Sequence, residues 1–276
     1  MPDRMTQHSL AAHDLSSGYA ERMIFQGLNL QIPAGRITAI VGANACGKST
    51  LLRTMSRLIA PEAGQVLLDG RSIHAMSPRH LARTLGLLPQ SPIAPEGITV
   101  ADLVGRGRHP HQGFLSRWTA GDDQAVAEAL QATGTQDLAE RAVDELSGGQ
   151  RQRVWIAMAL AQQTDLLLLD EPTTYLDICH QVEVLDLLVD LNRARGTTVV
   201  MVLHDLNLAA RYADHLVAMR AGSIDAFGPP DHVLTRDMVR RVFGLDSMVI
   251  SDPASGRPLM LPLGRHGVAQ PAARSA

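Results

Sequence analysis

The spacing of hydrophobic and polar residues changes twice along this chain of 276 residues, and each change marks a different kind of structure. Up to about residue 90, apolar runs are short and rich in branched side chains, which is typical of strands, and two segments show helical spacing. Strands are predicted here at 10–15, 24–32, 37–41, 65–68 and 85–88, and helices at 48–58 and 78–84. Gly18 and Tyr19 are expected to form the turn between the first two strands.

From residue 91 to about 161 the strand pattern disappears, and helices are predicted at 100–104, 122–133, 136–141 and 147–161. The third stretch opens with an unbroken apolar run at 166–169, which is typical of a parallel strand covered on both faces. It continues with a helix at 178–195, strands at 197–203, 216–219 and 223–227, and two further helices. The pattern predicts an α/β domain over residues 9–264 with a helical subdomain inserted at about 91–161. Residues 265–276 are polar and rich in alanine, and we expect them to be disordered.

Composition narrows the class of protein. Hydrophobic residues make up 45% of the chain and mean hydropathy is +0.01, enough for a sizeable core in one large α/β domain or in a domain that carries an inserted subdomain. The formal charge of −3 argues against bulk electrostatic binding to nucleic acid. No apolar run approaches the roughly 18 residues of a membrane span, and the N-terminus lacks an apolar signal core.

Cysteine and lysine usage adds two observations. Cys46 and Cys179 are too few for a disulfide framework and lack metal-site spacing, which favours a reducing cytoplasm. Of the 25 basic residues, 24 are arginine and only Lys48 is lysine. Lysine is a compact point charge, whereas arginine is a planar fork. Position 48 is therefore expected to need a small cation inside a tight backbone cage, with chance survival of one lysine as the alternative.

Lys48 lies in a match to the pattern G-x-x-x-x-G-K-[ST], between a predicted strand and a predicted helix. Backbone N–H groups of such a loop converge on phosphate oxygens at the start of the helix. Lys48 is predicted to reach the β- and γ-phosphates, and the Ser49 hydroxyl to ligate Mg²⁺. The flanking strand and helix disfavour a chance glycine loop. The predicted nucleotide-binding residues are Gly42, Ala43, Asn44, Ala45, Cys46, Gly47, Lys48, Ser49 and Thr50.

Two acids, Asp170 and Glu171, follow the apolar run at 166–169. Open α/β sheets collect their ligands at the carboxyl ends of parallel strands. Asp170 is predicted to hold hydrated Mg²⁺, and Glu171 to polarise the water that attacks the γ-phosphate. The alternative is an ordinary acidic helix cap before Pro172, which becomes less favoured once the acids are considered together with the phosphate loop.

The segment Leu146-Ser-Gly-Gly-Gln150 lies between these two motifs, about a hundred residues after the phosphate loop. This order of motifs resembles the ATPase subunits of ABC transporters, and the resemblance extends over residues 10–264. It implies a RecA-like P-loop NTPase core with a β subdomain and the inserted helical subdomain. In that family the segment opens a helix whose N-terminal amides face the γ-phosphate bound by a second subunit. The resemblance therefore places four residues against ATP in a head-to-tail dimer: Ser147, Gly148, Gly149 and Gln150.

Four further positions take their roles from the resemblance. Gln90 matches the glutamine that senses Mg²⁺ and the attacking water, and His204 matches the histidine that contacts the γ-phosphate. Asp177 matches the aspartate of a loop at the dimer interface, and Tyr19 the aromatic residue that stacks on adenine. Taken alone, they have simpler interpretations as a strand-end amide, a capping imidazole, a turn acid and a rim aromatic. The resemblance thus implies the catalytic residues Glu171, His204 and Gln90, and the metal ligands Ser49, Gln90 and Asp170.

The phosphate loop departs from the family pattern at two positions, with Ala43 in place of the usual proline and Ala45 in place of the usual glycine. Position 45 is one where φ > 0 is expected, which costs a residue other than glycine about 1 kcal/mol. We expect ATP to bind nonetheless, with modest strain at Ala45.

The segment 106–111, Arg-Gly-Arg-His-Pro-His, suggests a metal or phosphate patch. His109 and His111 are too close together, and lack a neighbouring cysteine or acid, to indicate a metal site. A surface loop is the interpretation we favour. The resemblance places it beside the groove that receives the cytoplasmic helix of a permease.

Within the ABC family, the chain is most similar to ATPase subunits of bacterial ferric-siderophore importers, with vitamin B12 and haem importers as near relatives. The similarity rests on the segments 88–90, 95–99, 170–178, 204–207 and 251–264. It implies hydrolysis of ATP that drives import through separate permease subunits at the cytoplasmic face of the cell membrane. A periplasmic or lipoprotein siderophore-binding protein is implied as an indirect partner. A soluble ABC ATPase without a permease stays open, as does an interaction module with an inactive site, which the intact acidic and basic site residues disfavour.

Overall fold

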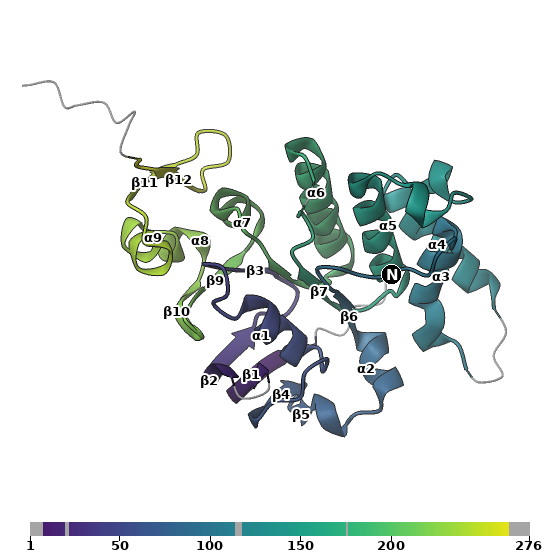
Figure 1. Cartoon of the computed structure of the whole chain (residues 1–276), viewed down its shortest axis with the longest axis horizontal. Helices are drawn as coiled ribbons and strands as arrows, with labels where there is room; N and C mark the ends of the chain where they lie inside the picture. Colours follow the sequence, from purple (N-terminus) through teal and green to yellow (C-terminus); the bar gives the residue numbers. More distant parts are fainter. Residues whose placement is uncertain (1–7, 20–21, 114–117, 175, 265–276) are drawn as a thin grey trace, which may run out of the picture.

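The computed structural model describes residues 8–19, 22–113, 118–174 and 176–264, which form three sheets and the helices packed on them (Figure 1). The largest sheet has the strand order β10-β9-β3-β8-β7-β6. Its strands are β3 (Ile37–Gly42), β6 (Leu85–Leu88), β7 (Leu166–Asp170), β8 (Thr198–Val202), β9 (His215–Arg220) and β10 (Ser223–Gly228). Neighbours are parallel except β9 and β10. The carboxyl ends of β3, β6, β7 and β8 therefore meet at one edge of the sheet.

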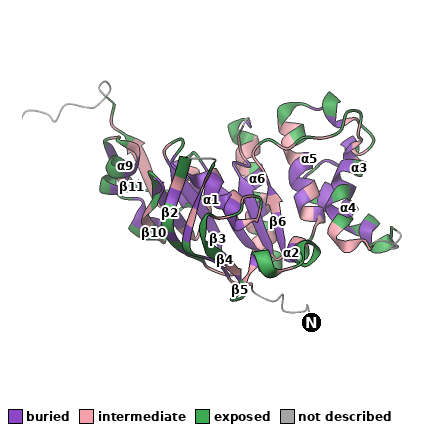
Figure 2. Ribbon diagram, turned by 60° about the horizontal axis from the view of Figure 1, so that its bottom comes forward, coloured by how far each residue is buried: buried purple, intermediate pink, exposed green. Residues whose placement is uncertain are grey.

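Burial on both faces explains the unbroken apolar pattern of β7. Leu167 and Leu169 pack into a core cluster that includes the helical subdomain, whereas Leu166 and Leu168 pack into a second cluster on the opposite face. Successive side chains of a strand point to opposite faces, so a strand covered on both sides is apolar at every position. Figure 2 shows this buried centre, with exposed residues on the outer helices and edge strands.

The second sheet is antiparallel, in the order β2-β1-β4-β5. It comprises β1 (Leu10–Tyr19), β2 (Arg22–Ile32), β4 (Ala63–Leu68) and β5 (Arg71–Ser72), and it packs on the central sheet together with helix α1 (Lys48–Met55). The predicted turn at Gly18 and Tyr19 is wrong, because β1 continues to Tyr19. Gly18 pairs closely with β2, where a Cβ atom would lie 2.2 Å from the carbonyl oxygen of Arg22.

The helical subdomain is inserted between β6 and β7 and lies beside the central sheet (Figure 1). It contains α3 (Val100–Gly105), α4 (Ala120–Ala132) and α5 (Gly148–Ala161), with the short 3₁₀ helices η2 (Arg106–His111), η3 (Gln136–Leu138) and η4 (Val143–Glu145). The predicted helix at 136–141 is present only as η3. The fold class, an α/β core with a β subdomain and an inserted helical subdomain, is confirmed.

The remaining elements complete the layers around the sheet. They are η1 (Ile73–Ala75), α2 (Pro78–Thr84), α6 (Ile178–Arg195), α7 (Leu206–Tyr212), α8 (Pro230–Val233), α9 (Arg236–Phe243), and a hairpin of β11 (Ser247–Ser251) and β12 (Pro258–Pro262). The hairpin, which the pattern does not predict, lies at the opposite end of the molecule from the helical subdomain (Figure 1).

The first helix is shorter than the spacing predicts. Helix α1 was expected to reach Leu58 but ends at Met55, and Arg57 adopts a left-handed φ of +66° that breaks the helix. The predicted disorder of 265–276 lies outside the described residues. Within the described parts of the chain, no helix combines the length and apolar character that crossing a membrane requires.

Candidate active site

The loop after β3 folds around a buried lysine. Lys48 is 5% exposed, and its Nζ donates hydrogen bonds to the carbonyl oxygens of Gly42 (2.9 Å) and Ala43 (3.1 Å). This backbone cage suits a compact ammonium group better than a planar guanidinium. The cage therefore explains why position 48 is a lysine in a chain whose other basic residues are arginine. The loop faces a cavity of about 410 Å³. The cavity is lined by Arg22, Ile24, residues 44–50, Gln90, Glu171 and His204.

The loop backbone depends on left-handed residues. Gly42 has a φ of +155°, and a Cβ atom there would lie 2.4 Å from the carbonyl oxygen of Met219. Gly47, the N-cap of α1, has a φ of +108°. The positive φ expected at Ala45 is confirmed at +60°. For an alanine this conformation costs about 1–2 kcal/mol, so the loop stores modest strain at this position.

Asp170, the last residue of β7, is bonded to the phosphate loop across the site. Ser49 Oγ donates a 2.8 Å hydrogen bond to Asp170 Oδ1. The other carboxylate oxygen, Oδ2, is buried and has no hydrogen-bond partner among the described residues; Arg53 Nη2 lies 3.7 Å away, beyond hydrogen-bond range. Burial raises the pKa of Asp170, although the Ser49 bond opposes this. A buried carboxylate with a free oxygen beside a serine hydroxyl is a donor set that fits a hard divalent cation.

Glu171 is held by three neighbours at the same edge. Its Oε2 accepts hydrogen bonds from Gln90 Nε2 (2.7 Å) and Thr174 Oγ1 (3.1 Å), while His204 Nε2 lies 2.6 Å from its Oε1. Glu171 is 9% exposed and has a left-handed φ of +56°. Such strain in a residue other than glycine clusters at functional sites. Gln90, Glu171 and His204, which follow β6, β7 and β8, are thus brought together at one point.

The remaining predicted site residues lie elsewhere in the described structure. Tyr19, Asp177 and the segment 147–150 do not contribute to the cavity lining. Tyr19 ends β1 and is 46% exposed, and its hydroxyl accepts a 3.5 Å bond from Arg53 Nη1. Asp177 caps α6, where its Oδ1 accepts the N–H of His180 at 3.1 Å.

The segment 147–150 begins helix α5 with a capping box. Ser147 Oγ accepts the N–H of Gln150 at 3.3 Å, and Gln150 Oε1 accepts the N–H of Ser147 at 3.1 Å. These two bonds satisfy orphan donors at the start of the helix. The amides of Gly148 and Gly149 follow in the first turn.

Sequence reasoning missed three contributors to the site. Arg22 and Ile24 line the cavity from β2, far from the motifs in sequence. Arg53 points toward both Asp170 and Tyr19 from α1. Only Arg53 had a signal in the sequence, because it lies four residues after Ser49 and therefore on the same face of the helix.

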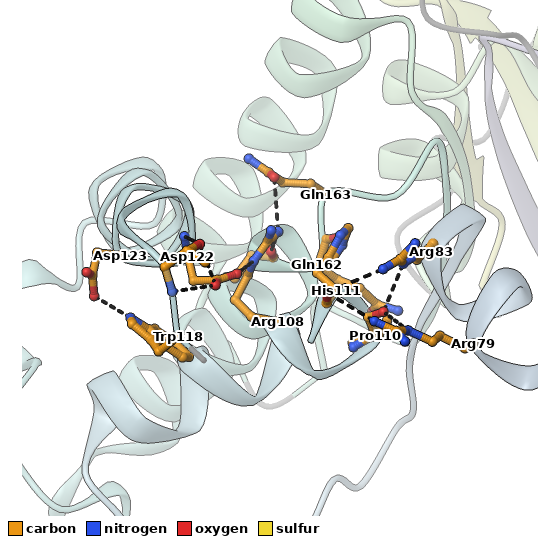
Figure 3. Close-up of polar contacts among 12 residues, drawn as sticks. Arg79, Arg83, Arg108, Pro110, His111, Trp118, Asp122, Asp123, Gln162 and Gln163 are labelled. Carbon is orange, nitrogen blue, oxygen red and sulfur yellow. Dashed lines mark hydrogen bonds and ion pairs between the residues drawn. The ribbon is translucent and has the colours of Figure 1, made fainter. Parts of the chain in front are cut away.

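Residues 106–111 form the helix η2, which is held in place by ionic and backbone contacts (Figure 3). Arg108 is buried at 7% exposure and pairs with Asp122 of α4, with 2.9 Å between Nε and Oδ1. Arg79 and Arg83 of α2 each donate a 2.9 Å bond to the carbonyl oxygen of Pro110. The prediction of a surface loop is therefore wrong for Arg108, which is part of the interior of the subdomain.

A second cavity of about 620 Å³ lies beside η2 on the helical subdomain. Acidic and basic side chains line it next to Trp118, which is about half exposed. Its polar and aromatic lining includes Asp102, Arg106, His109, Gln112, Trp118 and Asp123.

Taken together, the active-site geometry at the carboxyl edge of the parallel sheet is that of a P-loop NTPase. Residues 25–174 match the ABC transporter family. The chain is 54% identical to the probable siderophore transport system ATP-binding protein YusV of Bacillus subtilis, covering 95% of each chain. It is 52% identical to the ferric enterobactin transport ATP-binding protein FepC of Escherichia coli, covering 93% of this chain and 94% of that protein.

Among solved structures, an ABC transporter of metal-chelate type in an inward-facing conformation matches with a TM-score of 0.80 and 31% identity, covering 94% of this chain and 98% of that one. The chain belongs to the ABC transporter family and is one of its ATP-binding, ATP-hydrolysing subunits. The family predicted from the three motifs is confirmed.

Proposed function

We propose that this chain is the motor subunit of a bacterial ABC importer that takes up an iron(III)–siderophore complex. One observation carries the catalytic part: the Glu171 carboxylate lies 2.7 Å from Gln90 Nε2 and 2.6 Å from His204 Nε2, in the cavity that Lys48 faces. The siderophore part is supported by the two relatives, whose names specify siderophore transport and ferric enterobactin transport at 54% and 52% identity.

Ser49, Asp170 and Gln90 are the proposed ligands of Mg²⁺. The unpartnered Oδ2 of Asp170 and the Ser49 hydroxyl beside it support this assignment. A bound Mg²⁺ supplies positive charge that balances the phosphate oxygens. Lys48 and the backbone amides of residues 42–50 are proposed to bind the β- and γ-phosphates.

Glu171 is the proposed acceptor for the proton of the attacking water. Gln90 and Thr174 hold one carboxylate oxygen through hydrogen bonds and leave the other oriented toward His204. Fixed donors in a buried site stabilise developing charge without a reorganisation cost. His204 is proposed to donate to the γ-phosphate, and Gln90 to orient the water.

A second copy of the chain is proposed to complete the site. A Cβ atom on Gly148 would meet nothing within 4 Å, and one on Gly149 would find only ordinary contacts at 3.5 Å. Glycine in a helix costs about 0.5–1 kcal/mol relative to alanine, so the fold of one chain does not account for this pair. Close approach by the γ-phosphate bound to the other copy accounts for it, with Ser147 and Gln150 alongside and Asp177 at the interface. The exposed ring of Tyr19 is proposed to stack on adenine.

Separate permease subunits are the proposed membrane partners, with this chain bound at the cytoplasmic face of the cell membrane. The cavity of about 620 Å³ beside η2 is proposed to receive a cytoplasmic helix of the permease. A periplasmic or lipoprotein siderophore-binding protein would deliver the solute on the other side of the membrane. Two alternatives to iron–siderophore import are kept. The chain is then the ATPase of a vitamin B12 or haem importer, or a soluble ABC ATPase that works without a permease.

Growth on single iron sources tests the proposal. A strain that lacks this chain should fail to grow when a ferric siderophore is the sole iron source, and wild-type protein should restore growth while Glu171→Gln should not. Growth on excess ferrous iron serves as the control. Restoration confined to haem or vitamin B12 would favour those importers, and an unaffected strain would contradict a role in import.

A further inference from the structure

The C-terminal hairpin is joined to the helix after His204 by a side chain that pairs with backbone. Asn207 Nδ2 donates a 3.1 Å bond to the carbonyl oxygen of Met260, and the Met260 N–H donates a 2.7 Å bond to Asn207 Oδ1. The amide thereby takes the place that a neighbouring strand would occupy beside β12, and it satisfies both backbone polar groups of Met260.

His204 lies on a short connection whose two ends are fixed separately. Before it, the N–H of Leu203 donates a 3.1 Å bond to the carbonyl oxygen of Ile40 on β3. After it, Asp205 caps α7, and its Oδ1 accepts the N–H groups of Asn207 (2.8 Å) and Leu208 (2.9 Å). Asn207 is therefore both in the capped first turn of α7 and in contact with the hairpin.

The hairpin itself is well seated. Met260 packs against the main core cluster, and the N–H of Leu263 donates a 2.8 Å bond to the carbonyl oxygen of Asp246, which closes the base of the hairpin. In contrast, the His204 side chain is 47% exposed. Packing around the ring contributes little to its position, so apart from its contact with Glu171 the ring is placed by the backbone on either side.

We infer that the β11–β12 hairpin is a positioning element for ATP hydrolysis. Asn207 anchors the first turn of α7 to the hairpin and thereby keeps His204 within bonding distance of Glu171. The inference rests on the proposed role of His204. It extends the functional part of the chain to the hairpin at 247–262, which begins more than 40 residues after His204.

Steady-state ATPase measurements on the full chain test this inference with Asn207→Ala and the isosteric Asn207→Asp. Because His204 is proposed to act in the transition state, kcat should fall by roughly tenfold or more while KM for ATP stays within about twofold. Tyr212→Phe is the matched control, since it removes the 3.0 Å bond between α7 and Asp186 at the far end of the same helix. It should leave kcat unchanged.

A double-mutant cycle separates positioning from general stability. In a His204→Ala background, Asn207→Ala should lower kcat by less than about twofold, because the group that it positions is gone. An equal loss in both backgrounds would overturn the inference, as would wild-type kcat in both Asn207 variants. If Asn207→Ala does not fold, Asn207→Asp decides alone. Unchanged kcat in His204→Ala would overturn the proposed role of His204 itself, whereas a loss there without a loss in the Asn207 variants overturns only the hairpin's role.

Discussion

Gln90, which lies just before the helical insertion, donates a 2.7 Å hydrogen bond to Glu171, which follows the first strand after that insertion. Gln90 follows β6, where the chain leaves the central sheet, and Glu171 follows β7, where the chain has returned to it. The bond links the subdomain boundary directly to the proposed catalytic carboxylate.

Glu171→Gln should abolish hydrolysis while leaving nucleotide binding intact. The amide keeps the shape of the side chain but cannot accept a proton from water, and loss of general-base catalysis costs about 10²- to 10⁴-fold in kcat. Phosphate release measures hydrolysis, and a fluorescent ATP analogue measures binding. The exposed Glu96→Gln is the control and should behave as wild type. Retention of half the activity in Glu171→Gln would rule out this role.

Gly149→Ala should fold at least as well as wild type but lose ATPase activity. Within one chain the new methyl group meets only contacts of 3.5 Å, and alanine stabilises a helix relative to glycine by about 0.5–1 kcal/mol. Between two copies, the same methyl group would obstruct the approach of phosphate. Thermal unfolding and ATP-dependent dimerisation measure the two effects. Normal activity in this variant would count against the two-copy site.

Ala45→Gly should stabilise the fold slightly without changing ATP affinity. Removing a left-handed alanine gains about 1–2 kcal/mol, and the greater freedom of glycine in the unfolded chain returns about 0.4–1 kcal/mol of that. The neighbouring Ala43, whose φ is negative, supplies the control. The free energy of unfolding should be about 0.4–1 kcal/mol lower in Ala43→Gly than in wild type. Chemical unfolding of both variants checks the opposite signs. Equal effects would show that the φ of +60° at Ala45 carries no strain.

Arg108→Met should destabilise the helical subdomain strongly. Removing one partner of a buried pair leaves the Asp122 carboxylate uncompensated, which costs about 3–5 kcal/mol. The exposed pair Arg195–Glu128, with 3.4 Å between its atoms, is the matched comparison. Arg195→Met should cost less than about 1 kcal/mol. Urea unfolding of both variants measures the two losses of unfolding free energy. Similar losses would show that burying the Arg108–Asp122 pair does not make its removal more costly.

The Arg108–Asp122 pair predicts that the free energy of unfolding depends on pH in the acid range. The hydrogen bond from Arg108 lowers the pKa of Asp122 below its ordinary value of 3.8, so the unfolded chain binds the proton more readily than the folded chain. The stabilisation is therefore fully present well above pH 3.8 and is lost as the pH falls toward the lower pKa of the folded state. The free energy of unfolding of wild type minus that of Arg108→Met should be constant between about pH 7 and pH 5 and shrink below about pH 4. A difference that stays constant into the acid range would contradict the assignment.

The phosphate loop could be predicted because its chemistry depends on neighbours in the chain. Strand, loop and helix follow one another directly, so the positions of Lys48 and Ser49 follow from the motif alone, and so does the left-handed φ at Ala45. The strained φ of Glu171 could not be predicted in this way. It arises where β7 ends between neighbouring strands, and no local pattern in Asp170-Glu171-Pro172 requires it.

Contacts between distant segments account for most of what sequence reasoning missed. Asn207 and Met260 are 53 residues apart, and each looks ordinary in its own segment. Segment 106–111 looks like an exposed basic loop until the fold places Asp122 against Arg108. Helix ends were also missed, as in the predicted helix at 136–141, which is helical only over 136–138.

Lys48 holds the only side-chain amine among the 276 residues, and it is enclosed by the loop that surrounds it. Amine-directed reagents that label most proteins at many positions have only this group and the α-amino terminus to modify here. A lysine-specific protease likewise has a single place to cut, inside the nucleotide cavity. Among the side chains of this sequence, ordinary acylation chemistry therefore has one target, and its rate at Lys48 with and without nucleotide reports on that loop alone.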